Sequence, residues 1–282
     1  MSAIKMSMLK QRVVTALILV LILTLSLFAV PPSLFSLLIM LPITLAGWEW
    51  CKLADIKTKA GKFALLLTLI CLLFFAYFAL DVSGNFDRQV SYQICLYSLV
   101  LWAVILLWVQ GYPSSRVLWA KAPLIICLGL ILLCTTWVAL TAIVLYDNGQ
   151  WLLLLAILIV ALADLGGYFA GNLFGRHKLA AMVSPGKTWE GFLGGLFLQG
   201  LLILVIKLTF PELSAIDLAI LIIPVALSSV VGDLFESMLK RHSGVKDSSS
   251  LLPGHGGILD RIDGVMAALP MYWVLLFQGK VF

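Results

Sequence analysis

The sequence carries very little charge for its length. Only 12% of its 282 residues are Asp, Glu, Lys or Arg, whereas 62% are hydrophobic, and its mean hydropathy is +1.09. A chain with so few polar residues cannot cover the surface of a water-soluble globule. The composition therefore excludes an ordinary soluble domain and indicates an integral membrane protein.

Several functional motifs are also absent. No CxxC spacing occurs among the five cysteines, which lie in or beside apolar runs and are interpreted as small buried residues: Cys51, Cys71, Cys95, Cys127 and Cys134. The histidines are too scattered for a zinc site: His177, His242 and His255. The formal net charge is +5, but no Lys/Arg tract is present, so nucleic acid is not an expected partner.

Apolar runs close to bilayer-spanning length recur along nearly the whole chain. A helix needs about 17–25 apolar residues to cross a bilayer. We predict about nine such helices, over residues 13–30, 34–50, 63–80, 93–110, 123–146, 151–170, 191–210, 215–239 and 262–278. The second and last are short enough to be tilted or partial, so eight or ten spans also fit the pattern. The predicted fold class is all-α and polytopic.

The distribution of basic residues predicts a cytoplasmic N-terminus. With that orientation, only Arg88, Lys207 and Lys280 of the 19 Lys and Arg residues fall outside the cytoplasmic segments. Such a bias is typical of membrane proteins, because cationic loops resist translocation. The first run resembles a signal peptide but is too long for one and lacks a clear cleavage site, so we interpret it as a retained span.

Residues able to do chemistry concentrate in the second half of the chain. The first five predicted spans hold almost no charge within the membrane, so residues 1–150 are interpreted as a transmembrane scaffold. The cytoplasmic loops at 172–190 and 240–261 contain nearly all the residues that could do chemistry. Residues 151–282 are therefore predicted to form the catalytic region of a single membrane domain, with the active site facing the cytoplasm.

A polar stripe marks the end of the eighth predicted span. Asp233, Glu236, Ser237 and Lys240 stand at i, i+3, i+4 and i+7, which places them on one helical face. A carboxylate near hydrocarbon costs about 2.5–3.5 kcal/mol, so these acids need partners, water or metal. The alternative is an acid–lysine pair at a helix end that merely reaches the interface.

The following loop is rich in glycine and charge. Gly254, Gly256 and Gly257 allow the backbone to approach a ligand closely, and Asp260 and Asp263 lie one turn apart at the start of the next helix. Carboxylate oxygens suit Mg²⁺, and phosphate oxygens suit the neighbouring cations, Arg241, Lys246 and Arg261. The pattern favours a phosphate and metal site over a flexible turn between spans. The role of His255 stays open.

A second cluster begins inside the sixth predicted span. Asp164 is an acid within an apolar segment, and Gly167, Gly171 and Gly175 share an adjacent face that we expect to pack against a neighbouring helix. The segment 184–191, Ser-Pro-Gly-Lys-Thr-Trp-Glu-Gly, lacks the glycine spacing of a P-loop. Its Lys187 and Thr188 are nevertheless suited to contact phosphate or nucleotide; a solvated connector is the alternative.

These motifs together resemble those of a known family. The run from Ser237 to Asp263, with Leu-Lys-Arg, Lys-Asp, Leu-Pro-x-His-Gly-Gly-Ile and Asp-Arg-Ile-Asp at fixed spacing, resembles the signature of phosphatidate cytidylyltransferases, also called CDP-diacylglycerol synthases. Ser184-Pro-x-Lys187-Thr188-x-Glu190-Gly191 is also similar to that family. The resemblance is strong over about 160–265 and only architectural before it.

The resemblance implies an enzyme that makes CDP-diacylglycerol and pyrophosphate from CTP and phosphatidic acid, as a homodimer in the bilayer of the bacterial inner membrane. By motif position, Asp233 and Asp260 would hold a pair of metal ions, Mg²⁺ and a second cation, with Asp263 as a further ligand. The expected catalytic residues are Asp233, Asp260, Asp263 and Lys246. The expected substrate contacts are Asp164, Ser184, Lys187, Thr188, Glu190, Ser237, Lys240, Arg241, Asp247, His255, Gly256, Gly257 and Arg261.

The expected reaction is an in-line attack of the lipid phosphate on the α-phosphorus of CTP, without a protein nucleophile. Three other classes of protein are alternatives. A CTP-dependent lipid kinase would transfer the γ-phosphate instead. A transporter would explain buried acids but should show inverted repeats or paired broken helices, and neither is found. A non-catalytic scaffold would leave the acids and bases of 233–263 unexplained.

Overall fold

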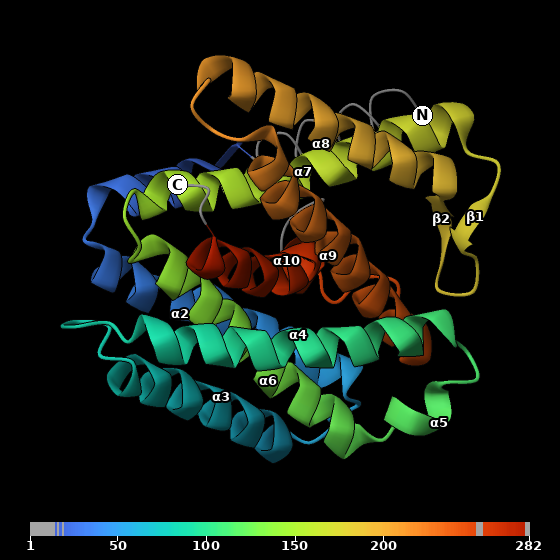
Figure 1. Cartoon of the computed structure of the whole chain (residues 1–282). Helices are drawn as coiled ribbons and strands as arrows, with labels where there is room; N and C mark the ends of the chain where they lie inside the picture. The colour runs from blue at the N-terminus through green and yellow to red at the C-terminus, as the bar shows by residue number, and fades with distance from the viewer. Residues whose placement is uncertain (1–14, 16, 19, 252–255, 280–282) are drawn as a thin grey trace.

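The computed structural model describes residues 15, 17–18, 20–251 and 256–279. These residues form a helical bundle with one small hairpin (Figure 1). The long helices are α2 (Pro32–Leu53), α3 (Lys59–Ala79), α4 (Arg88–Gln110), α6 (Ala122–Val144), α7 (Gly149–Phe174), α8 (Trp189–Thr209), α9 (Ala215–His242) and α10 (Leu259–Gln278). A single turn, α5 (Arg116–Trp119), connects α4 to α6.

Seven of the described helices, α2, α3, α4, α6, α7, α8 and α9, are long and apolar enough to cross a membrane. Each coincides with one of the predicted spans, so the all-α polytopic class is confirmed at this coarser level. The first predicted span lies partly outside the described residues, where Val20–Ala29 forms a shorter apolar helix. The last is α10, a helix of 20 residues that begins with charged side chains. The count of nine and the orientation stay predictions.

Helix α10 lies in the middle of the bundle, as its red ribbon shows in Figure 1. It packs against α9, α6, α4, α7 and α2. Most of its side chains from Gly264 to Leu276 are buried, including Trp273 and Tyr272. Because its N-terminal turn carries Asp260 and Asp263, this central position fixes both acids relative to the surrounding helices.

Close glycine contacts join α7 to α8. A Cβ at Gly166 would stand 2.5 Å from the carbonyl oxygen of Gly194, so the two backbones approach too closely for larger residues. Gly171 likewise faces Gly191 and Thr188 at the start of α8. The prediction of packing against a neighbouring helix is confirmed for Gly167 and Gly171, whereas Gly175 lies after the end of α7 and meets Thr188 instead. This contact sets α7, and Asp164 with it, beside the segment that leads into α8.

The segment predicted as an irregular loop after α7 contains an antiparallel hairpin, a correction to the purely helical expectation. Its strands are β1 (Lys178–Ala180) and β2 (Ser184–Thr188), with Lys178 opposite Thr188. The sequence pattern of β2, with Pro and Gly, gives no strand signal, since both residues are depleted in strands. Thr188 ends the hairpin and caps α8, because its hydroxyl accepts a hydrogen bond from the backbone N–H of Gly191 at 3.1 Å.

Candidate active site

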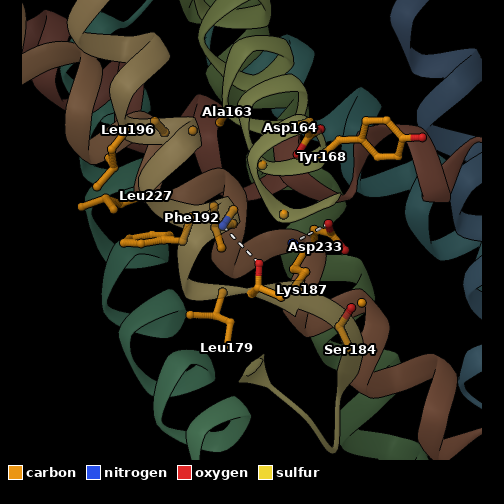
Figure 2. A pocket seen from close by; sticks show the side chains of 18 of the residues that line it. Ala163, Asp164, Tyr168, Leu179, Ser184, Lys187, Phe192, Leu196, Leu227 and Asp233 are labelled. Atoms are coloured by element: carbon orange, nitrogen blue, oxygen red, sulfur yellow. Dashed lines mark hydrogen bonds and ion pairs between the residues drawn. The ribbon is translucent and has the colours of Figure 1, made fainter. Parts of the chain in front are cut away.

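A cavity of about 470 Å³ opens between α7, the hairpin, α8 and α9. Figure 2 shows Asp164, Asp233, Lys187 and Ser184 toward one side of it. Phe192, Leu196 and Leu227 lie toward the other side in the same view. The cavity therefore combines a charged wall, which suits a phosphate or its counter-ion, with an apolar wall of membrane-spanning helices.

An ion pair joins the hairpin to α9 in this cavity. The Lys187 ammonium lies 2.5 Å from Oδ2 of Asp233, with both side chains about a quarter exposed, at 25% and 29%. The other oxygen of Asp233 accepts a hydrogen bond from the hydroxyl of Ser237 one turn later, at 3.3 Å. The pairing of Ser237 with Asp233 is the outcome expected from their i, i+4 spacing.

Two further carboxylates lie within electrostatic range of Asp233. The negative charge of Asp233 disfavours ionisation of Asp164 in α7 and of Asp263 in α10, and the charge of Asp164 has the same effect on Asp263. Lys187 and Arg261 oppose the negative charge at Asp164. Acids from three helices, separated by as many as 99 residues in the sequence, thus lie within electrostatic range of Asp233 or of one another. Such a concentration of negative charge suits a bound cation.

A second ion cluster lies one turn further along α9. The ammonium of Lys240 is 2.5 Å from Oε2 of Glu236 and 2.7 Å from Oδ1 of Asp260, so one cation bridges two carboxylates. Glu236 is fully buried, and the Asp260 side chain is only 8% exposed. The sequence predicted Lys240 as a substrate contact; the structure gives it an internal bridging position between α9 and α10.

The carboxylate of Asp260 is held by the loop that precedes it. Besides Lys240, it accepts hydrogen bonds at Oδ2 from the backbone N–H of Ser248 at 3.0 Å, from the Ser248 hydroxyl at 2.8 Å, and from the N–H of Gly257 at 2.8 Å. Charge-assisted bonds of this kind are stronger than neutral ones. Asp260 therefore fixes Ser248 and Gly257 against the start of α10 and is itself fixed by them.

Two other predicted substrate contacts brace the hairpin. Both oxygens of Glu190 accept from backbone N–H groups, with Arg176 at 3.1 Å and His177 at 3.2 Å, and Oε1 lies 2.6 Å from Nδ1 of His177. The Arg241 Nε donates to the carbonyl of Val183 at 3.2 Å. These contacts give both residues a role in holding the loop 176–188. Their predicted contact with substrate stays a prediction.

The remaining predicted site residues that the structure describes do not line the cavity beside Asp233. Lys246 and Asp247 line a separate cavity of about 840 Å³, together with Lys52, Lys62 and the serines 248–250. Gly256 has a φ of +82°, which L side chains rarely adopt, and this is the backbone freedom expected of it. Arg261 is exposed at the start of α10. His255 lies outside the described residues.

Sequence reasoning missed Glu49, an acid within the second apolar segment. It is 1% exposed in α2, and it accepts hydrogen bonds from the loop that carries Ser248 and from the start of α10. The signal was available, because a carboxylate inside an apolar run is costly without partners. Residues 1–150 therefore supply a charged group to the neighbourhood of the site, although the division at residue 150 itself stays a prediction.

The donor chemistry of this region fits a hard divalent cation. Carboxylate oxygens dominate it, and Oε1 of Glu236 is buried without a hydrogen-bond partner in the described part of the chain. The ammonium groups of Lys187 and Lys240 already pair with Asp233 and Asp260, which shows that these carboxylates stabilise positive charge. Across residues 20–251 and 256–279, however, no three His, Cys, Asp or Glu side chains converge as a metal-binding group. The assignment of Asp233, Asp260 and Asp263 as ligands stays a prediction.

Gly257 offers a test of how tightly this region is packed. A Cβ at Gly257 would stand 2.5 Å from Oε2 of Glu49, so Gly257→Ala must displace that carboxylate or the loop. We expect a stability loss of about 1–3 kcal/mol, typical of overpacking, together with lower activity. Thermal unfolding in detergent measures the first. The matched control is Gly200→Ala, since a Cβ there meets nothing within 4 Å; equal effects of both changes would contradict the packing described.

The comparisons with known proteins agree with the motifs. A model described as the cytidylyltransferase family matches residues 10–278 of the 282. The chain belongs to the cytidylyltransferase family. Within this family, it is 39% identical over 274 residues to a phosphatidate cytidylyltransferase of Pseudomonas aeruginosa, covering 96% of this chain and 98% of that one.

A second cytidylyltransferase, the phosphatidate cytidylyltransferase of Haemophilus influenzae, is 38% identical over 291 aligned positions, covering 96% of this chain and 99% of that protein. One of Staphylococcus saprophyticus is 46% identical over 134 residues, covering 47% and 51%. The family resemblance predicted from the residues is therefore confirmed. Two matches extend over nearly the entire chain, so membership includes the N-terminal helices, where the motifs gave only an architectural likeness.

Proposed function

We propose that this cytidylyltransferase converts CTP and phosphatidic acid into CDP-diacylglycerol and pyrophosphate, in the phospholipid biosynthesis of a bacterial inner membrane. The observation that carries the proposal is the cavity beside Asp233. It lies among membrane-spanning helices and has a charged wall that suits a phosphate and an apolar wall that suits an acyl chain. The names of the relatives agree with this assignment.

In the proposed reaction, an oxygen of the lipid phosphate attacks the α-phosphorus of CTP. The new bond joins the lipid phosphate to the cytidylyl group, and the bond to the departing pyrophosphate breaks. A phosphate monoester is largely ionised at neutral pH, its second pKa being about 6, so no general base is required. The protein must instead bring two anions together, which depends on positioning and electrostatic stabilisation.

Lys187 is suited to one of these anions. Its ammonium lies in the cavity and now pairs with Asp233, so an arriving phosphate can share it. Arg261, which is exposed near the same acids, is suited to the second anion. Lys240 is held between Glu236 and Asp260 and stabilises the arrangement of the acids. We place Lys246 at the neighbouring loop cavity as a further contact for the triphosphate.

Asp233, Asp260 and Asp263 would hold Mg²⁺ and a second cation in this proposal. Such cations would offset the negative charge of the attacking phosphate and of the leaving pyrophosphate. The acids would hold those cations in fixed positions, since each acid lies on a packed helix. We also propose a homodimer, as the family resemblance implies. We further propose a cytoplasmic N-terminus and an active site that faces the cytoplasm, as the excess of basic residues in the loops 54–58, 111–121, 175–188 and 243–258 favours.

Labelled nucleotide tests the reaction. Purified protein in mixed micelles with phosphatidic acid, Mg²⁺ and α-labelled CTP is expected to give labelled lipid and an equal amount of pyrophosphate. γ-Labelled CTP is expected to leave the lipid unlabelled. A lipid labelled only from the γ-position would identify a lipid kinase and overturn the proposal. Omission of phosphatidic acid is the control for hydrolysis of CTP.

A further inference from the structure

Glu49 binds the loop before α10 through both of its oxygens. Oε1 accepts from the hydroxyl of Ser249 at 2.5 Å and from the N–H of Ile258 at 3.0 Å. Oε2 accepts from the hydroxyl of Ser248 at 3.1 Å and from the N–H of Leu259 at 2.7 Å. One buried carboxylate thus satisfies four donors that lie 199–210 residues away in the sequence.

Two of these donors explain why α10 begins where it does. The N–H groups of Ile258 and Leu259 stand at the start of α10, where no earlier turn supplies acceptors, and no side chain of the helix's own N-cap residue does so. A negative charge at a helix N-terminus is also favourable. Glu49 therefore supplies from α2 the cap that α10 lacks in its own sequence, and it fixes the first turn that carries Asp260.

The contact with Ser248 extends this effect to the Asp260 carboxylate. The Ser248 hydroxyl lies 3.1 Å from Glu49 Oε2 and 2.8 Å from Asp260 Oδ2. Because a hydroxyl has a single proton, the two acids share this donor. Ser248 is therefore a direct link between a carboxylate of the N-terminal helices and a carboxylate of the proposed catalytic set.

Neighbouring residues of α2 strengthen the attachment. The Lys52 ammonium, one turn after Glu49, donates to the carbonyls of Asp247 and Ser248 at 3.3 Å each. The carbonyl of Leu53 accepts from the Ser243 hydroxyl at 2.9 Å. The end of α2 thus contacts the loop between α9 and α10 at several points. The buried carboxylate of Glu49 is the anionic group among them.

We propose that Glu49 is a positioning residue for cytidylyl transfer, which sets the place of Asp260 through Ser248 and through the first turn of α10. The proposal rests on the proposed function, because it gives Asp260 a part in that reaction. Glu49 also lines the cavity that holds Lys246, but both of its oxygens are taken up by the four protein donors, so the proposal gives it no contact with substrate. Its removal should therefore lower kcat and leave the KM values for CTP and phosphatidic acid near those of the native enzyme.

The test compares Glu49→Gln, Ser248→Ala and the double variant in the α-labelled CTP assay. Glutamine keeps the size but brings an NH₂ donor toward groups that are themselves donors. We expect kcat to fall about 10- to 100-fold in Glu49→Gln, in line with the sensitivity of catalysis to misplacement near 1 Å. The double variant should lose less than the product of the single losses, because both changes break one link.

Ser36→Ala is the matched control, since Ser36 is a fully buried polar residue of the same helix with no contact to the loop, its hydroxyl donating to Pro32. Thermal unfolding is measured for every variant. If Glu49→Gln does not fold, the proposal is tested with Ser248→Ala alone. An unchanged kcat in Ser248→Ala then overturns it. So does native kcat in Glu49→Gln, or full multiplicativity of the two losses. Failure of the native enzyme to label lipid would instead overturn the proposed function.

Discussion

Replacement of Asp260 by Asn is expected to lower CDP-diacylglycerol synthesis by about 100-fold or more, the cost of losing a preorganised electrostatic group. Asn is neutral, so the Lys240 ammonium loses one of the two carboxylates between which it lies. Its NH₂ group also cannot accept the hydrogen bonds that Ser248 and Gly257 donate to the native carboxylate. The measurement is the initial rate with α-labelled CTP at saturating Mg²⁺.

The control for this change is Asp217→Asn. Asp217 is a half-buried acid in the first turn of α9, at the end of that helix opposite the site. We expect it to leave the rate unchanged. Both variants should insert into the membrane and be extracted by detergent like the native protein. A rate in Asp260→Asn equal to that of Asp217→Asn would remove Asp260 from the site.

Replacement of Lys240 by Met is expected to destabilise the protein by about 3–5 kcal/mol, the usual cost of breaking a buried ion pair on one side. Lys240 is only 15% exposed, and its removal leaves Glu236 and Asp260 close together without their shared cation. Thermal unfolding in detergent should show a clear fall in Tm. Activity should fall as well, because the two acids then repel each other.

Two comparisons sharpen this prediction. Lys59→Met changes an exposed lysine at the start of α3 and should be nearly neutral. Adding Glu236→Gln to Lys240→Met removes one of the two uncompensated charges, so the double variant should recover part of the lost stability. A Tm for Lys240→Met within error of that for Lys59→Met would show that the bridge between α9 and α10 contributes little.

The polar stripe of α9 could be predicted because it depends on local geometry alone. Helical periodicity places Asp233 and Ser237 on one face, and the structure joins them by a hydrogen bond. Apolar run length likewise located the seven membrane-spanning helices. Features that depend on a single helix, such as its length or which side chains share a face, can therefore be predicted from the sequence.

Glu49 and Lys187 show what periodicity cannot reveal. The partners of Glu49 lie at the other end of the chain, so its role depends on how α2 packs beside the start of α10. Lys187 was predicted as a phosphate contact, but its pairing with Asp233 requires the hairpin to fold against α9. The hairpin itself was not predicted, because Pro185 and Gly186 are residues that rarely occur in strands. Tertiary packing decides each of these features.

Binding of Mn²⁺, a paramagnetic substitute for Mg²⁺, tests the central claim most directly. That claim is that the acids at the start of α10 and the end of α9 bind cations, and that these cations reduce the repulsion between the two anionic phosphates that react. Electron paramagnetic resonance of the purified native protein should show bound Mn²⁺, and Asp233→Asn and Asp260→Asn should each weaken this binding by about tenfold or more, the effect of losing a ligand or its close partner. Binding that is equal in the native protein and in both variants would contradict the account.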